Sequence, residues 1–177
     1  MQTRTAALSR SSACQGCGLV LPAHAGPIHA YFGASAACWN LYRELLTEPG
    51  ARETGTRVRR LAEDTYAVQH PGVNRRRCLQ SVAVHLMGLC VLLEREGEQR
   101  RLVPLLGRMP ARRTLALYWL TPPEPNGHLT VVEAAHGLTG ESRDASIELW
   151  ARDLWDAWEP HHETVRGWLD APALRVA

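Results

Sequence analysis

Residues 79–93 carry apolar side chains on nearly every side of a helix rather than along one stripe. A helix that is apolar all round must be surrounded by other protein or by lipid. The longest apolar run, residues 82–93, is interrupted by His85 and is too short to span a bilayer. The segment therefore predicts a central helix that other helices of the same domain cover.

Amphipathic helices are predicted on both sides of this segment. Residues 36–47 and 57–70 each repeat apolar side chains at helical spacing, and Pro71 ends the second of these patterns. The longest amphipathic pattern covers residues 142–170, with a kink expected at Pro160. Together these patterns predict a mainly α fold, a single-domain helical bundle.

Two short patterns predict where helices begin. Ser35 directly precedes the first amphipathic pattern, and serine is a favoured N-cap residue. Thr130 is followed three residues later by Glu133, which is the spacing of a capping box. We therefore expect helices to begin close to residues 36 and 131.

The N-terminal part of the chain differs in composition from the rest. Residues 1–13 predict a disordered tail, and residues 14–177 predict a single helical domain. Within that domain, residues 14–35 are rich in Gly and Pro and are expected to form a loop-rich lobe that zinc stabilises. A chain of 177 residues can bury a core without a metal, so a metal site must be argued from its own residues.

Charge excludes several classes of function. All 20 members of the Lys+Arg count are arginine, which excludes a Schiff-base lysine or a P-loop lysine. The formal net charge is +2, and the short arginine clusters are dispersed among acidic residues. We therefore expect neither a nucleic-acid nor a membrane partner, and we expect a cytoplasmic protein.

A Cys-x-x-Cys-Gly motif at Cys14 and Cys17 is the most specific short pattern in the chain. Two thiolates at this spacing can hold one tetrahedral ion, and Cys38 at a helix start could add a third. His24 and His29 lie between these cysteines, and His29 completes the set that we prefer. The predicted zinc ligands are Cys14, Cys17, His29 and Cys38. A dithiol redox pair at Cys14 and Cys17 is the alternative interpretation.

A second candidate cluster consists of histidines from three predicted helices. His85 lies in the most apolar segment, His70 ends the preceding helix, and His162 lies in the last one. If the bundle brings them together, His70, His85 and His162 could hold a divalent metal or form an acid–base site. The alternative is that His85 is a hydrogen-bonded core residue and that His70 interacts favourably with a helix C-terminus.

The assembled motifs resemble an uncharacterised bacterial family that is known only as a domain of unknown function. The resemblance rests on CQGCGLVLP (14–22), GPIHAY (26–31), ASAACW (34–39), DTYAVQHPG (64–72), QSVAVHL (80–86) and WEPHHETVRGW (158–168). It implies functional positions at Cys14, Cys17, His29, Cys38, His70 and His85, and it implies no activity. Cys78 falls where this family pattern has no cysteine.

These observations leave three hypotheses for function. The first is a zinc-binding cytoplasmic helical protein of unknown molecular function. The second is a metal-dependent hydrolase or transferase whose ion is held by histidines in the bundle; the sequence does not decide whether the protein is an enzyme. The third is a protein-interaction module or homo-oligomer, which an exposed apolar patch around Trp155 and Trp168 would favour. The number of protein ligands separates the first two hypotheses. Four protein ligands indicate a structural site, whereas three protein ligands and one water molecule indicate a catalytic site.

Overall fold

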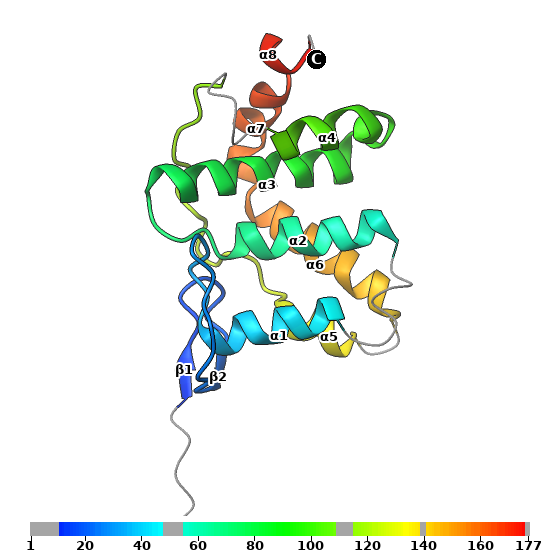
Figure 1. Cartoon of the computed structure of the whole chain (residues 1–177). Helices are drawn as coiled ribbons and strands as arrows, with labels where there is room; N and C mark the ends of the chain where they lie inside the picture. The colour runs from blue at the N-terminus through cyan, green and yellow to red at the C-terminus, as the bar shows by residue number, and fades with distance from the viewer. Residues whose placement is uncertain (1–10, 48–54, 109–114, 139–140, 176–177) are drawn as a thin grey trace, which may run out of the picture.

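The structure, a computed structural model, describes residues 11–47, 55–108, 115–138 and 141–175. It is mainly helical, as the sequence predicts (Figure 1). Its helices are α1 (Ala36–Thr47), α2 (Thr56–Gln69), α3 (Arg76–Glu94), α4 (Gln99–Arg108), α5 (Val131–His136), α6 (Arg143–Ala157), α7 (His162–Leu169) and α8 (Pro172–Arg175). Two short 3-10 helices, Glu96–Glu98 and Glu159–His161, precede α4 and α7.

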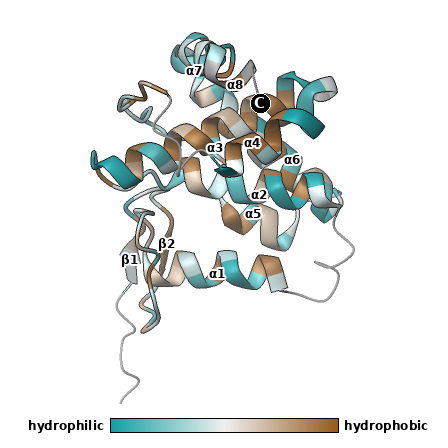
Figure 2. Ribbon diagram, turned by 45° about the horizontal axis from the view of Figure 1, so that its top comes forward, coloured by the Kyte–Doolittle hydropathy of each residue, from teal (hydrophilic) through white to brown (hydrophobic). Residues whose placement is uncertain are grey.

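Helix α3 is the centre of the bundle. It packs against α2 on one side and against α4 and α7 on the others. Its buried residues point in all directions around the helix, among them Leu86, Met87, Leu89 and Val91. By length and composition α3 could cross a membrane, but most of it is buried inside the protein. Its apolar character is therefore accounted for by the helices around it (Figure 2).

The other helices form the rest of the core around this centre. Helix α2 lies between α1 and α3, and α6 packs against both α2 and α5 (Figure 1). Trp150 in the middle of α6 and Trp158 directly after its end are completely buried. The long amphipathic pattern predicted for residues 142–170 forms two helices, α6 and α7. Helix α6 ends at Ala157, and the 3-10 helix Glu159–His161, which contains Pro160, separates it from α7.

The N-terminal lobe contains a small hairpin that the sequence patterns do not reveal. Strand β1 (Ser11–Ala13) pairs antiparallel with β2 (Val20–Pro22), in the register Ser11 opposite Pro22 and Ala13 opposite Val20. The sequence predicts a disordered tail over residues 1–13, but residues 11–13 form a strand. Residues 1–10 of the predicted tail lie outside the described residues. The hairpin stands beside the start of α1 and the end of α2 (Figure 1).

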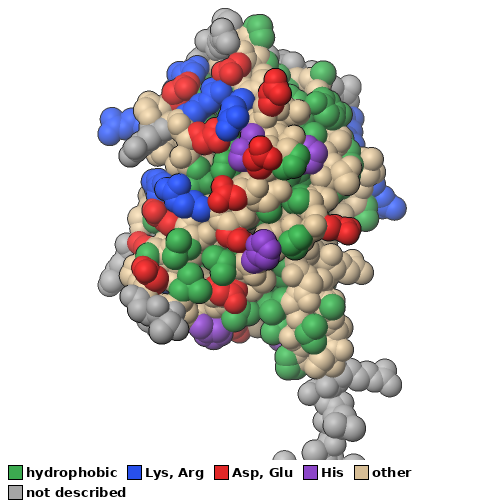
Figure 3. All heavy atoms as spheres, turned by 180° about the vertical axis from the view of Figure 1, so that it is seen from behind, with side chains coloured by type: hydrophobic (Ala, Val, Ile, Leu, Met, Phe, Trp, Pro, Cys, Tyr) green, Lys and Arg blue, Asp and Glu red, His purple; other side chains and the backbone are tan. Residues whose placement is uncertain are grey.

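The two tryptophans that were expected to mark an interaction surface are buried. Trp155 and Trp168 are 5% and 7% exposed, so they are core residues and do not form an exposed apolar surface. On the face shown in Figure 3, acidic and basic side chains are both present and interspersed with other residues. That distribution matches the dispersed charge of the sequence.

Candidate metal centre

Cys14 and Cys17 lie in the loop that joins the two strands of the hairpin. The loop is closed by two backbone hydrogen bonds, from the Cys14 amide to Leu19 and from the Gly18 amide to Cys14, both 2.9 Å long. Gly18 has a φ of 73°, in the left-handed region that residues with a Cβ seldom adopt. The Cys-x-x-Cys-Gly motif is therefore a tight turn that presents two thiols on the same side.

Cys38 reaches the same place from the first turn of α1. The Cys38 amide donates a hydrogen bond to the Ser35 hydroxyl, 3.2 Å away, so Ser35 caps this helix as predicted. The Ser35 amide in turn donates to the Cys14 sulfur at 3.3 Å. One serine thus connects the helix start to the hairpin thiol.

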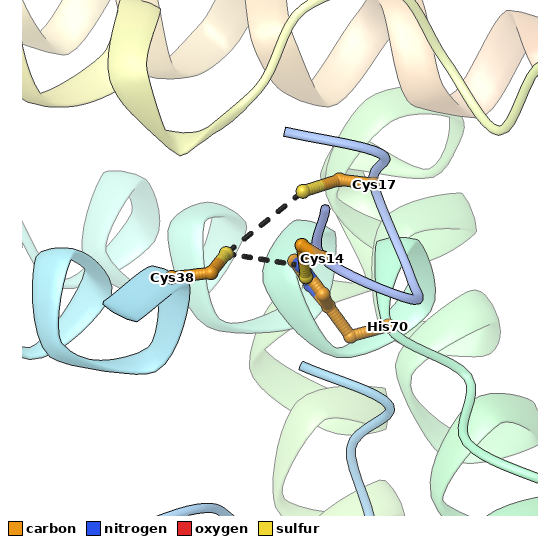
Figure 4. Close-up of side chains that lie close together, drawn as sticks. All are labelled: Cys14, Cys17, Cys38 and His70. Atoms are coloured by element: carbon orange, nitrogen blue, oxygen red, sulfur yellow. Dashed lines mark hydrogen bonds between the residues drawn. The ribbon is translucent and has the colours of Figure 1, made fainter. Parts of the chain in front are cut away.

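His70 directly follows the last residue of α2 and provides the fourth side chain. Its Nε2 lies 3.3 Å from the Cys38 sulfur, and the Cys17 and Cys38 sulfurs are 3.8 Å apart. The ligand atoms of Cys14, Cys17, Cys38 and His70 all lie within 4.8 Å of one another (Figure 4). Cys14, Cys38 and His70 are buried and Cys17 is partly buried. This group could hold a metal ion.

The spacing of these atoms fits a tetrahedral ion. Sulfurs about 2.3 Å from a tetrahedral Zn²⁺ lie ~3.8 Å from each other, and a sulfur and a nitrogen lie ~3.5 Å apart. The Cys17–Cys38 and Cys38–His70 distances are close to these values. The cluster therefore has the dimensions of a Cys₃His site.

The His70 ring is oriented by the helix that carries it. Its Nδ1 lies 2.7 Å from the Tyr66 carbonyl oxygen, one turn earlier in α2. A carbonyl can only accept, so Nδ1 carries a proton, and Nε2 is the ring nitrogen that faces the cluster and that a metal ion would bind. Tyr66 also donates its hydroxyl to the Cys38 sulfur at 3.6 Å, and its ring stacks on His70.

The end of α2 is fixed to the rest of the bundle by a buried amide network. Gln69 donates to the Asn126 and Leu129 carbonyls at 3.1 and 2.8 Å, and it accepts from the Trp150 indole at 3.1 Å. Asn126 donates back to the Gln69 carbonyl at 3.0 Å and accepts from the Trp158 indole at 2.8 Å. His70 therefore follows a residue whose amide has little freedom to move.

Close packing joins the hairpin loop to His70. A Cβ atom on Gly16 would lie 2.5 Å from Cδ2 of the His70 ring and 2.8 Å from the Gln69 carbonyl oxygen. It would also lie 2.8 Å from the His70 Cα, so two of the three contacted atoms are backbone and a side-chain rotation alone could not relieve the contact. Gly16 can approach the imidazole this closely because it has no side chain.

The protonation states within the cluster are coupled. Hydrogen bonds from Cys17 and Cys38 hold the pKa of the Cys14 thiol far below its ordinary value. Hydrogen bonds with Cys14 and Cys17, together with burial, raise the pKa of Cys38. Burial lowers the pKa of His70, but hydrogen bonds with Cys14 and Cys17 outweigh it and raise that pKa to about 9. The Cys14 thiolate is therefore favoured in a largely buried place, where a cation beside it is stabilising.

The predicted set of ligands differs from this group at one position. The structure brings Cys14, Cys17 and Cys38 together, but His29 lies outside the group and His70 takes the fourth place. The His29 ring stacks on Phe32 with centroids 3.9 Å apart, and its Nδ1 accepts a hydrogen bond from the Tyr31 amide. His29 is predicted as a ligand because it lies close in sequence to the three cysteines. His70 follows the end of α2, which only the tertiary fold brings to the site.

The second predicted cluster is not assembled. Among the described residues, the group at metal-ligand distance contains His70 but neither His85 nor His162. His85 donates a hydrogen bond from Nδ1 to the Asp64 carboxylate at 2.6 Å. His162 stacks on the Trp155 ring, and its Nε2 lies 2.9 Å from the Trp155 carbonyl oxygen. The three helices place these histidines in three separate environments.

One buried carboxylate was missed by the sequence analysis. Asp64 is completely buried in α2, where it contacts both His85 and Arg60. A signal was present in the sequence, because Asp64 lies three residues after Leu61 and so falls beside the apolar stripe of its helix.

Comparisons with known proteins place the chain without assigning it an activity. Residues 12–159 match a family of unknown function, DUF5946. The match contains the hairpin loop, the start of α1 and the end of α2, and hence all four side chains of the cluster. No curated protein and no solved structure matches the chain.

Proposed function

The chain belongs to the family of unknown function DUF5946, and we propose from its own geometry that it binds one Zn²⁺ as a structural ion. The ligands are Cys14, Cys17, Cys38 and His70. The observation that carries this proposal is the buried group of three sulfurs and one imidazole nitrogen, all within 4.8 Å of one another.

The donor set favours zinc over other metals. Thiolate and imidazole ligands in a tetrahedral arrangement suit Zn²⁺, whereas Mg²⁺ and Ca²⁺ take oxygen ligands at higher coordination number. The hydrogen bond at Nδ1 holds the His70 ring so that Nε2 faces the cysteines, and the Ser35 amide points at the Cys14 sulfur. Such outer hydrogen bonds are typical of ligand residues in zinc sites.

The role of the ion follows from the elements that it joins. The four ligands come from the hairpin loop, the start of α1 and the residue after α2, which are far apart in the sequence. Four protein ligands leave no open position for water or substrate, so the site is structural rather than catalytic. The ion fastens the N-terminal lobe and α1 to the bundle. Because such a site needs reduced thiols, we also propose a reducing compartment, the cytoplasm.

The test compares matched variants of the full chain by native mass spectrometry and elemental analysis. We expect one Zn²⁺ per wild-type chain, and its loss in Cys38→Ser and in His70→Gln. Cys78→Ser and His29→Gln change the same residue types outside the cluster and should keep the ion. Folded wild-type protein without metal would refute the proposal. Loss of zinc in His29→Gln with retention in His70→Gln would refute the ligand assignment.

A further inference from the structure

A second site is built around a buried ion pair between α2 and α3. The Asp64 carboxylate has no exposed surface; it accepts a hydrogen bond from Arg60 Nε at 3.0 Å, and His85 Nδ1 lies 2.6 Å from its other oxygen. Gly88 in α3 makes room for it, since a Cβ there would lie 2.3 Å from Oδ2 of Asp64. Glycine weakens the interior of a helix. The interior of α3 thus carries a glycine where the buried carboxylate approaches it.

The pair fixes the orientation of the His85 ring. Because Nδ1 is held by Asp64, the opposite edge of the ring, which carries Nε2, faces away from the carboxylate. Phe32 packs edge-on against the ring with centroids 6.4 Å apart. In the described part of the chain no other residue forms a hydrogen bond with Nε2, and 14% of the His85 side chain is exposed. An imidazole held in this way can offer Nε2 to a ligand.

His85 lines a surface pocket of about 360 Å³. One face of α3 forms most of the wall, and Tyr31 from the loop before α1 forms the rest. The lining residues are Tyr31, Arg77, Gln80, Ser81, Val84 and His85. Pockets for small molecules combine apolar walls with a few convergent polar groups, and this pocket has both.

The polar groups of the pocket indicate the charge of its ligand. Arg77 is the cation of the lining, and its guanidinium lies over the Tyr31 ring, 5.9 Å from the centroid. Its Nη1 is also 3.5 Å from the Tyr31 hydroxyl. Gln80, Ser81 and Tyr31 add further hydrogen-bond donors, while the acidic residue of the site, Asp64, is buried behind His85 and already paired. The accessible wall is therefore rich in donors and carries no carboxylate.

From these observations we propose that the pocket binds a small organic anion. Arg77 pairs with its carboxylate or phosphate group, and Tyr31 and Val84 contact its apolar part. In the complex the His85 ring is an imidazolium that donates Nδ1–H to Asp64 and Nε2–H to an oxygen of the anion. Arginine suits this role because its planar donors match both kinds of oxyanion. Asp64 is a positioning residue that holds the imidazole. The proposal does not depend on the zinc site, because none of the zinc ligands lines the pocket.

Phenyl phosphate and phenylacetate serve as probes. Inorganic phosphate and phenol, which are the anionic and the aromatic part of phenyl phosphate, serve as controls. Each compound is titrated into the ¹⁵N-labelled full chain. Calorimetry measures the affinity, and the NMR resonances of the histidine rings show where the compound binds. The ring resonance that is absent from the His85→Gln spectrum is assigned to His85. We expect saturable binding of at least one aromatic anion, with one site per chain and a shift of the His85 ring. Inorganic phosphate and phenol should each bind more weakly. The stronger of the two aromatic anions identifies the head group as phosphate or carboxylate.

Arg77→Gln is the decisive variant because Arg77 is exposed and its replacement leaves the core intact. It should weaken the binding of the aromatic anion at least about tenfold, as expected for loss of a charged hydrogen bond. Arg76→Gln removes the neighbouring exposed arginine, which does not line the pocket, and should leave binding unchanged. The proposal is overturned if neither aromatic anion binds saturably at millimolar concentration. It is also overturned if Arg77→Gln binds as well as wild type, or if the His85 ring signal does not move.

Discussion

Nδ1 of His70 lies 2.7 Å from the Tyr66 carbonyl oxygen, so the last turn of α2 itself orients the imidazole toward the cysteines. The backbone of α2 therefore does more than carry the ligand to the site. It keeps a proton on Nδ1, so Nε2 is the nitrogen that is left to coordinate an ion. The same turn is tied to α6 through Gln69 and Trp150, which connects the metal centre to the middle of the core.

Replacement of Gly16 by alanine tests the contact between the hairpin loop and this imidazole. The added Cβ would lie 2.5 Å from the His70 ring and 2.8 Å from backbone atoms, so either the loop or the helix end must move. We expect Gly16→Ala to lower the free energy of unfolding by about 2 kcal/mol and to weaken zinc binding. Thermal unfolding and competition with a chromophoric chelator measure the two effects.

Gly107→Ala is the matched control for this substitution. Gly107 is exposed in α4, and a Cβ there meets no atom within 4 Å. Alanine favours helix more than glycine does, so this variant should be as stable as wild type or slightly more stable. Equal behaviour of the two variants would show that the loop does not rest on His70 as described.

The helical elements could be predicted from local patterns, because each depends on side chains that are close in sequence. The pattern at 36–47 coincides with α1, and the capping box of Thr130 and Glu133 is present at the start of α5. The apolar segment at 79–93 is the central part of α3. Three of the four residues in the metal group were also identified, since the Cys-x-x-Cys spacing and a cysteine at a helix start are local features.

What could not be predicted depends on contacts between distant segments. The choice between His29 and His70 as the fourth ligand depends on where the end of α2 lies relative to the hairpin. The family resemblance includes both histidines, so it does not distinguish them. The hairpin strands are only three residues each and lack a recognisable alternation. The pairing of Asp64 with His85 joins two helices, and no spacing along either helix reveals it.

His85→Ala tests the buried pair independently of any ligand. Removal of the imidazole leaves the Asp64 carboxylate without one of its two partners in a place that water does not reach. We expect a loss of about 2–3 kcal/mol in the free energy of unfolding. His128→Ala is the control, since His128 also lies beside an aspartate, Asp153, but its side chain is 77% exposed. That change should cost less than about 0.5 kcal/mol. Equal costs for the two variants would contradict the buried role of His85.

Glu94 predicts a dependence of stability on pH in the acid range. Hydrogen bonds from Arg166, and further from the Trp155 indole, lower the pKa of this carboxyl from 4.5 to about 2. The stability it contributes is therefore complete above pH 4.5 and is lost as the pH falls toward 2. Because the group is partly exposed, we expect this contribution to be about 1 kcal/mol.

The measurement compares the unfolding of wild type and Glu94→Gln at a series of pH values. Taking the difference between the two proteins removes the effect of zinc release in acid, which both share. The difference should be largest above pH 4.5 and should diminish toward pH 2. Arg166→Gln removes the main cause of the shift and should show the same trend. A difference that does not change with pH would mean that the Arg166 contact does not perturb Glu94.

Removal of the metal should loosen each element that supplies a ligand. The ligands connect the hairpin loop, α1 and the end of α2, and the binding free energy of a structural zinc ion contributes directly to folding. After chelation we expect faster amide hydrogen exchange in residues 14–33 and 36–47 and in the last turn of α2. Exchange in the middle of α6, which supplies no ligand, should change least. If exchange rises only in residues 14–20, Cys38 and His70 are not ligands. If it rises chiefly around His85 and His162, the ion is bound inside the bundle and not at the Cys₃His site.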